Sequence, residues 1–189
     1  MAIMSRRLTG ATFVRPADAT QYSIGDEISN NATAGSVVLA TFANLAGFRR
    51  VQPIRMGVAI TPASASLVIT ALDFSVYLFK TADVPAAGGD NVALALTAVQ
   101  RQHACKFSFV DTAWAQPTGA ATSGASGYQE AFPAIGGIYT SVGNVIEFTG
   151  SEANGEARSL TLVLQADQAW NPGAVAQTFT FALDLTCEP

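Results

Sequence analysis

The chain has 189 residues, of which 49% are hydrophobic and 13% charged, and its formal net charge is −4. This apolar content excludes whole-chain disorder and is enough for one ordinary domain without a metal or disulfide staple. The scattered Lys and Arg residues argue against a nucleic-acid binder, which normally carries a basic face. So little charge suits either a protein packed against neighbours or a sparsely charged free surface.

Residues 1–14 mix basic and apolar side chains without the apolar stretch of a signal peptide. Two interpretations stay open: an arm that becomes ordered on a partner, or an edge strand of the chain's own sheet. Without any run of about 18 apolar residues, the sequence predicts no membrane span and a protein made in the cytoplasm. The candidate partner-binding residues of this segment and its boundary are Arg6, Arg7, Phe13 and Arg15.

Residues 15–26 are typical of a turn-rich entry into the first strand. Pro16 fixes φ, Asp18 suits an Asx-turn and Gly25 permits a tight turn. Strands are predicted at residues 22–28 and 36–42, both weakly, and at residues 50–60. Pro53 indicates an edge, a bulge or a bend near the start of the third strand. Its expected inward residues are Ile54, Met56, Val58 and Ile60.

Residues 67–79 carry apolar side chains on both faces, which favours a central strand or one covered by another layer. Residues 92–101 allow one or two helical turns but are too short to decide. A strand at residues 104–110 brings Cys105, Phe107 and Phe109 to one face. Residues 116–129, rich in small side chains, predict a long loop.

The clearest strands come last. Residues 144–148 are a short candidate, residues 158–166 point Leu160, Leu162 and Leu164 inward, and residues 177–187 alternate strictly. The inward set of the final strand is Phe179, Phe181, Leu183, Leu185 and Cys187. About eight short strands with little or no helix predict a single antiparallel all-β sandwich, jelly-roll-like, over residues 15–189.

Residue types needed for catalysis are scarce. The single histidine, His103, precedes a predicted strand, and no Gly-x-Ser-x-Gly elbow accompanies it. One His and two distant Cys do not supply a usual zinc site, and no Walker-type phosphate loop is present. Cys105 and Cys187 are expected to be buried free thiols, with a disulfide as the alternative. The sequence thus predicts a non-enzymatic protein with no catalytic residue, metal or cofactor.

Four aromatic residues lie in or near predicted loops and allow two interpretations. They form either a stacking platform for a glycan or lids over the ends of the sandwich. These residues are Trp114, Tyr128, Tyr139 and Trp170.

Two stretches carry a resemblance. The first is residues 15–30, RPADATQYSIGDEISN, and the second is residues 72–96, with Tyr77-Leu-Phe79, Pro85 and Asp90-Asn91. Both resemble segments of small structural proteins of tailed bacteriophages, of the capsid-associated and decoration type, over roughly residues 12–112. The resemblance implies a virion protein on the capsid surface: a head decoration or cement protein that binds the major capsid protein, commonly a homotrimer. A tail or baseplate component, or a glycan-binding sandwich, is the alternative.

Overall fold

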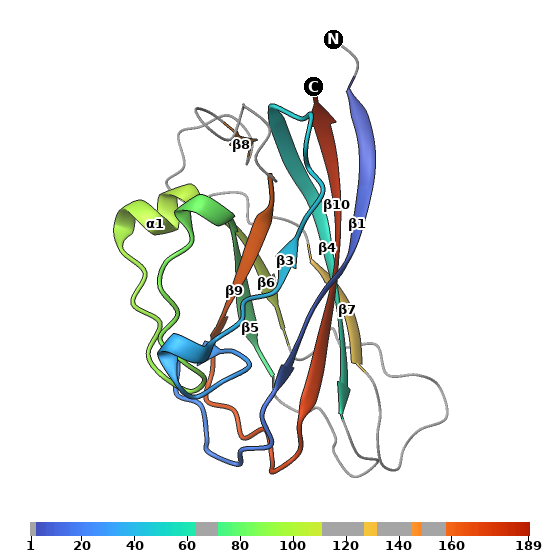
Figure 1. Cartoon of the computed structure of the whole chain (residues 1–189). Helices are drawn as coiled ribbons and strands as arrows, with labels where there is room; N and C mark the ends of the chain where they lie inside the picture. Colours follow the sequence, from blue (N-terminus) through green and yellow to red (C-terminus); the bar gives the residue numbers. More distant parts are fainter. Residues whose placement is uncertain (1–2, 63–71, 111–126, 132–144, 149–157) are drawn as a thin grey trace, which may run out of the picture.

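The computed structural model describes residues 3–62, 72–110, 127–131, 145–148 and 158–189. Within these ranges, ten strands form two five-stranded antiparallel sheets that pack face to face (Figure 1). The predicted all-β sandwich is therefore confirmed. Trp114 and Tyr139 lie outside the described residues, as does most of the loop predicted at residues 116–129.

Sheet 1 contains the longest strands. Its order is β1, β10, β4, β7, with β8 also paired to β4. These strands are β1 (Met4–Arg15), β10 (Gln177–Glu188), β4 (Arg50–Pro62), β7 (Gly127–Ala131) and β8 (Ile146–Glu147).

Sheet 2 has the order β2, β9, β5, β6, with β3 also paired to β9. Its strands are β2 (Glu27–Ile28), β9 (Leu160–Ala166), β5 (Phe74–Lys80), β6 (Cys105–Phe109) and β3 (Thr41–Phe42). In sheet 1 the first strand thus pairs with the last, and in sheet 2 an early strand pairs with the penultimate one. This winding of one chain through two sheets is the arrangement of a jelly roll.

The main core lies between the sheets and is rich in phenylalanine. Phe13 of β1 stacks on Phe179 of β10 at 4.9 Å between ring centroids, and Phe74 of β5 meets Phe179 edge-on at 6.0 Å. The expected inward faces of β6, β9 and β10 are all buried. Cys105 and Cys187 are buried free thiols, and burial raises the pKa of Cys105 to about 12.

A second, smaller core lies on the outward face of sheet 2. We call residues 84–104 the cover; they include the helix α1 (Ala98–His103), which begins in a capping box formed by Thr97 and Gln100. Leu94 and Leu96 of the cover pack on outward residues of β5 and β9. Figure 1 shows α1 on the side of sheet 2 that faces away from sheet 1. The covered strand predicted around residues 67–79 is confirmed for its described part. Two short 3₁₀ turns, Ala34–Ser36 and Thr81–Asp83, complete the helical elements of the described residues.

Three details differ from the sequence-based expectations. Ile54 is 43% exposed, because the register of β4 and β10 shifts beside it and Pro53 is buried in its place. Thr161 and Gln165, which the alternation of residues 158–166 directs away from the core, are nevertheless buried, Thr161 against Thr41 and Thr81 and Gln165 against the Leu94 carbonyl oxygen of the cover. Strand β7 occupies the end of the predicted loop, while the strands expected at residues 22–28 and 36–42 shrink to two residues each.

Residues 4–15, most of which belong to the segment considered as an arm, form β1 at the edge of sheet 1. Their backbone pairs with β10 from Met4 opposite Cys187 to Arg15 opposite Gln177. The register shifts at Gly10, whose φ of +93° is readily adopted only by glycine. Of the two interpretations, the structure therefore has the edge strand of the chain's own sheet.

Candidate interaction surface

Among the described residues, no group of three or more His, Cys, Asp and Glu side chains could hold a metal ion. His103 is the last residue of α1. Trp170 is buried, so it is not part of an exposed stacking platform. In the described part of the chain, no helix has the length and apolarity needed to cross a bilayer.

Arg15 is a charged side chain that lies fully inside the molecule, at the end of β1. Its guanidinium donates to the side-chain oxygen of Gln177 at 3.0 Å and to the carbonyl oxygen of Asp18 at 3.0 Å. Two more bonds reach the carbonyl oxygens of Gly173 and Val175 at 3.3 and 3.1 Å. Burying a charge is costly unless it is paired and hydrogen-bonded, and these acceptors satisfy that condition.

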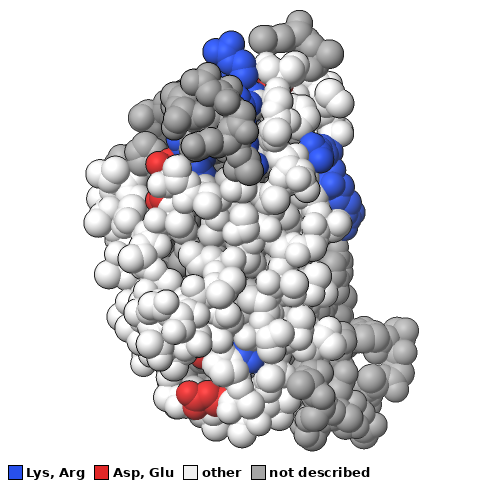
Figure 2. All heavy atoms as spheres, viewed as in Figure 1, with Lys and Arg blue, Asp and Glu red and all other residues white. Residues whose placement is uncertain are grey.

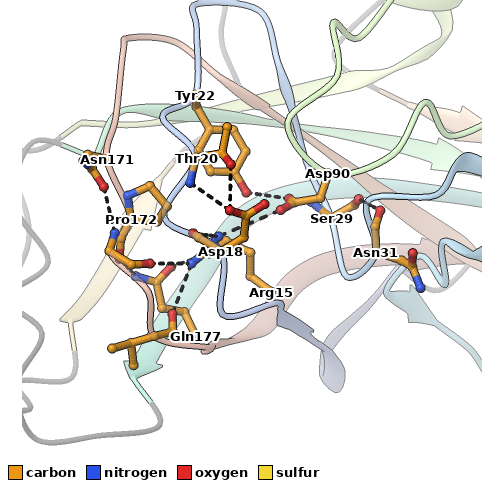
Figure 3. Close-up of polar contacts among 12 residues, drawn as sticks. Arg15, Asp18, Thr20, Tyr22, Ser29, Asn31, Asp90, Asn171, Pro172 and Gln177 are labelled. Atoms are coloured by element: carbon orange, nitrogen blue, oxygen red, sulfur yellow. Dashed lines mark hydrogen bonds and ion pairs between the residues drawn. The ribbon is translucent and has the colours of Figure 1, made fainter.

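Asp90 is the counter-ion of Arg15, with 3.9 Å between Oδ2 and Nη1 (Figure 3). Its Oδ1 accepts hydrogen bonds from the Tyr22 hydroxyl at 2.5 Å and the Ser29 backbone N–H at 2.9 Å. The rings of Tyr22 and Trp170 stack at 5.3 Å, and the guanidinium lies within 6 Å of both. Burial raises the pKa of Asp90, while these donors and the guanidinium act against the rise.

Glu27 in β2 is a second buried carboxyl group. Its Oε2 accepts the backbone N–H of Gly88 at 2.7 Å, and its Oε1 meets no donor among the described residues. Burial and the charge of Asp90 raise the pKa of Glu27, against the N–H groups of Gly88 and Gly89. The Asn91 N–H donates to the Glu27 carbonyl oxygen at 2.9 Å, so backbone and side chain hold the same turn.

We call this network the buried joint: Arg15, Tyr22, Glu27, Ser29 and Asp90. It links residues 15–30 to residues 72–96, the two segments that carry the family resemblance. The approach is so close that a Cβ added at Gly89, whose φ is +110°, would lie 2.5 Å from the Ala32 carbonyl oxygen. Because its polar groups bond mainly to one another and to nearby backbone, we interpret the joint as a structural lock on two loops.

Two of the four candidate partner-binding residues face inward. Phe13 is buried in the main core against Phe179. Arg15 is buried in the joint, where its donors bond within the chain. Their contacts in this structure are therefore internal.

The other two reach the surface on β1. Arg6 is half-buried, with its guanidinium 5.7 Å from the ring centroid of Phe48. Arg7 has a side chain 52% exposed and lies 3.7 Å from Asp184 on β10. The structure thus separates the four residues into an inward pair and an outward pair on one edge strand.

The outward face of sheet 1 has no covering layer among the described residues. Across β1, β10 and β4 it presents small side chains in register, which we call the open face: Thr9, Thr12, Ala59, Thr178, Thr180 and Ala182. Charge enters this face at two levels: Asp184 meets Arg7 and also Arg55 at 2.6 Å, and Glu188 meets Arg50 at 3.6 Å. In the view of Figure 2, Lys and Arg gather at the upper end and right border, and the broad middle is uncharged.

Comparison with known proteins gives no match to any protein-family model and none to a curated protein sequence. Among solved structures, the decameric BFDV capsid protein is similar over 100% of both chains, with 12% identity and a TM-score of 0.30. A chain of the Kashmir bee virus virion at neutral pH is similar over 95% of this chain and 70% of that chain, with 9% identity and a TM-score of 0.36. A chain of Cocksfoot mottle virus is similar over 97% and 95%, with 7% identity and a TM-score of 0.26. These are weak likenesses of fold, and a shared fold does not assign a function.

Proposed function

We propose that this chain is a non-enzymatic virion structural protein that decorates or cements a phage capsid by binding the major capsid protein. The observation that carries the proposal is the open face of sheet 1, a broad β surface of small, uncharged side chains. Threonine and alanine lose little side-chain entropy when a partner covers them, so such a face favours extended contact. The polar interior, in contrast, is used to fix the chain's own loops.

The resemblance of residues 15–30 and 72–96 to capsid-associated phage proteins supports the same function. In the structure these segments meet in the buried joint, so the resemblance rests on residues that act together in space. Residues that preserve a loop junction are those expected to persist in a family whose members share a scaffold.

The proposal places the protein on the capsid surface, after synthesis in the host cytoplasm, as a homo-oligomer with a trimer favoured. Several weak contacts per subunit then add up, because the second and third binding events are intramolecular.

Co-sedimentation tests the proposal. The purified chain is mixed with empty shells assembled from the major capsid protein encoded by the same genome, and the mixture is separated on a sucrose gradient. We expect the chain to move with the shells and to saturate at a fixed ratio, while an unrelated protein of equal mass stays at the top. Shells that sediment without the chain would overturn the proposal. Light scattering of the free chain gives its oligomeric state.

A further inference from the structure

One end of the sandwich, where β1 begins and β10 ends, exposes apolar side chains beside arginines. Met4 opens β1 and is 54% exposed, and Ile3 before it is 67% exposed. Arg49 is exposed and follows the half-buried Phe48. The Arg49 N–H donates to the Glu188 carbonyl oxygen at 2.8 Å, which places Arg49 beside the end of β10.

The charge at this end is unevenly balanced. Arg50 is neutralised by Glu147 at 2.8 Å and by Glu188 at 3.6 Å. Arg6 and Arg49, however, form no ion pair with any residue in the described part of the chain. The unpaired positive charge of this end therefore rests on these two side chains.

At the opposite end of the sandwich, the exposed charge is negative instead of positive. Among the described residues, the arginine at this end is Arg15, which is buried in the joint, whereas Asp18 and Asp26 are partly exposed there. Ile24 is exposed at this end, so both ends offer apolar contact, but only one offers unpaired positive charge. Electrostatic complementarity gives an approaching partner its orientation, and here it distinguishes the two ends.

We infer that the end formed by Ile3, Met4, Arg6, Phe48 and Arg49, which we call the basic end, docks onto an acidic and partly apolar patch of the capsid protein. The inference rests on the proposed function and names its contact surface. Arg, Met and aromatic residues are the types enriched at the centre of protein interfaces, where they supply most of the binding energy. A nucleic-acid surface would instead show a longer basic stripe without an apolar centre.

Affinity for the shells tests the inference in the full chain. Arg49→Glu and Met4→Ser alter the basic end, and we expect each to weaken binding at least about tenfold, the size of a moderate hot-spot loss. The wild-type affinity should also fall with added salt. Two matched controls at the opposite end, Ile24→Ser and Ala19→Glu, should stay within about twofold. Melting curves identify any variant that fails to fold, in which case Arg49→Gln replaces Arg49→Glu.

The outcomes separate the inference from the function. If the wild type binds shells and Arg49→Glu and Met4→Ser bind equally well, the inference is overturned while the function stands. Loss of binding by Thr180→Glu would then assign the contact to the open face alone. If the wild type binds no shells, the proposed function itself fails. If the wild type binds a single-stranded DNA 30-mer as tightly as shells, and Arg49→Glu loses both, the assigned partner class is wrong.

Discussion

The two sheets differ in what lies on their outward faces. Sheet 2 points Tyr77, Phe79 and Val163 outward, and the cover buries them beneath Leu94 and Leu96. Sheet 1 points mainly threonine and alanine outward, with Val14 beside them, and no layer covers them among the described residues. The two environments differ accordingly, because β5 and β9 are buried at nearly every position whereas β10 alternates between buried and more exposed residues.

The covered face of sheet 2 and the open face of sheet 1 give the two sides of this jelly roll different surroundings. The cover is tied down by the buried joint, since Asp90 and the turn before it lie within residues 84–104 and bond to β2 and the loops before and after it. Sheet 2 is therefore the side whose outward residues pack and bond within the chain itself. In the proposed function, the open face of sheet 1 is the surface for contact with other molecules.

The largest effect is expected in the core that both sheets share. Phe181→Ala removes a fully buried ring from β10 and should lower the free energy of unfolding by about 3–5 kcal/mol. Urea denaturation followed by fluorescence measures the change. A loss below about 1 kcal/mol would mean that the space between the sheets is not the main core.

The contrast between covered and open faces is tested by one change on each. Leu94→Ala removes a buried contact of the cover and should cost about 2–3 kcal/mol, toward the lower end of the usual range because Leu94 lies near the surface. Thr180→Ala on the open face should stay within about 0.5 kcal/mol. Equal losses in urea denaturation would show that the two faces do not differ in packing.

Two glycines with positive φ give a finer version of the same contrast. Gly89→Ala forces a Cβ against the Ala32 carbonyl oxygen and should cost about 2 kcal/mol or more. Gly10→Ala, in the bulge of β1, meets nothing within 4 Å and should cost only the backbone strain, about 1 kcal/mol. Thermal unfolding of both variants ranks them, and the reverse order would place the tighter packing in β1.

The last prediction concerns pH. Burial raises the pKa of Glu27 above its unfolded value of about 4.3, so folding favours the protonated acid. The stability that Glu27 contributes is present below about pH 4.3, the pKa of the unfolded chain, and is lost as the pH rises through the folded pKa. Glu27→Gln cannot ionise, so its unfolding free energy should improve relative to wild type between pH 4 and 8. Denaturation at several pH values checks this, and a constant difference would contradict it.

Local patterns in the sequence predicted the long strands well. The inward faces of β6, β9 and β10 follow from strict alternation, which any sandwich must bury. The pattern failed at Ile54 because a bulge changes the register without changing the alternation of residue types. It also missed β7, whose five residues GYQEA show no apolar alternation and which is held by pairing with β4.

The buried joint could not be predicted from local patterns. Arg15 and Gln177 are 162 positions apart, and Asp90 reaches Tyr22 across 68 positions. In the sequence these residues are typical of turns and strand ends, where charged side chains normally meet water. The one available signal was the pair Gly88-Gly89, which permits a close approach of two backbones but does not name the partner.

The central place of β10 in sheet 1 also constrains how the nascent chain can fold. β10 separates β1 from β4, and the pairing of Met4 with Cys187 spans almost the whole sequence. Until residues 177–188 have emerged from the ribosome, β1 lacks its only strand neighbour among the described residues and β4 has an open edge. Sheet 1 can therefore be completed only after β10 has been synthesised. Its closure costs a large loop entropy, which is typical of slow-folding β proteins. Truncation before residue 177 would leave two unpaired edges, the condition under which β chains aggregate.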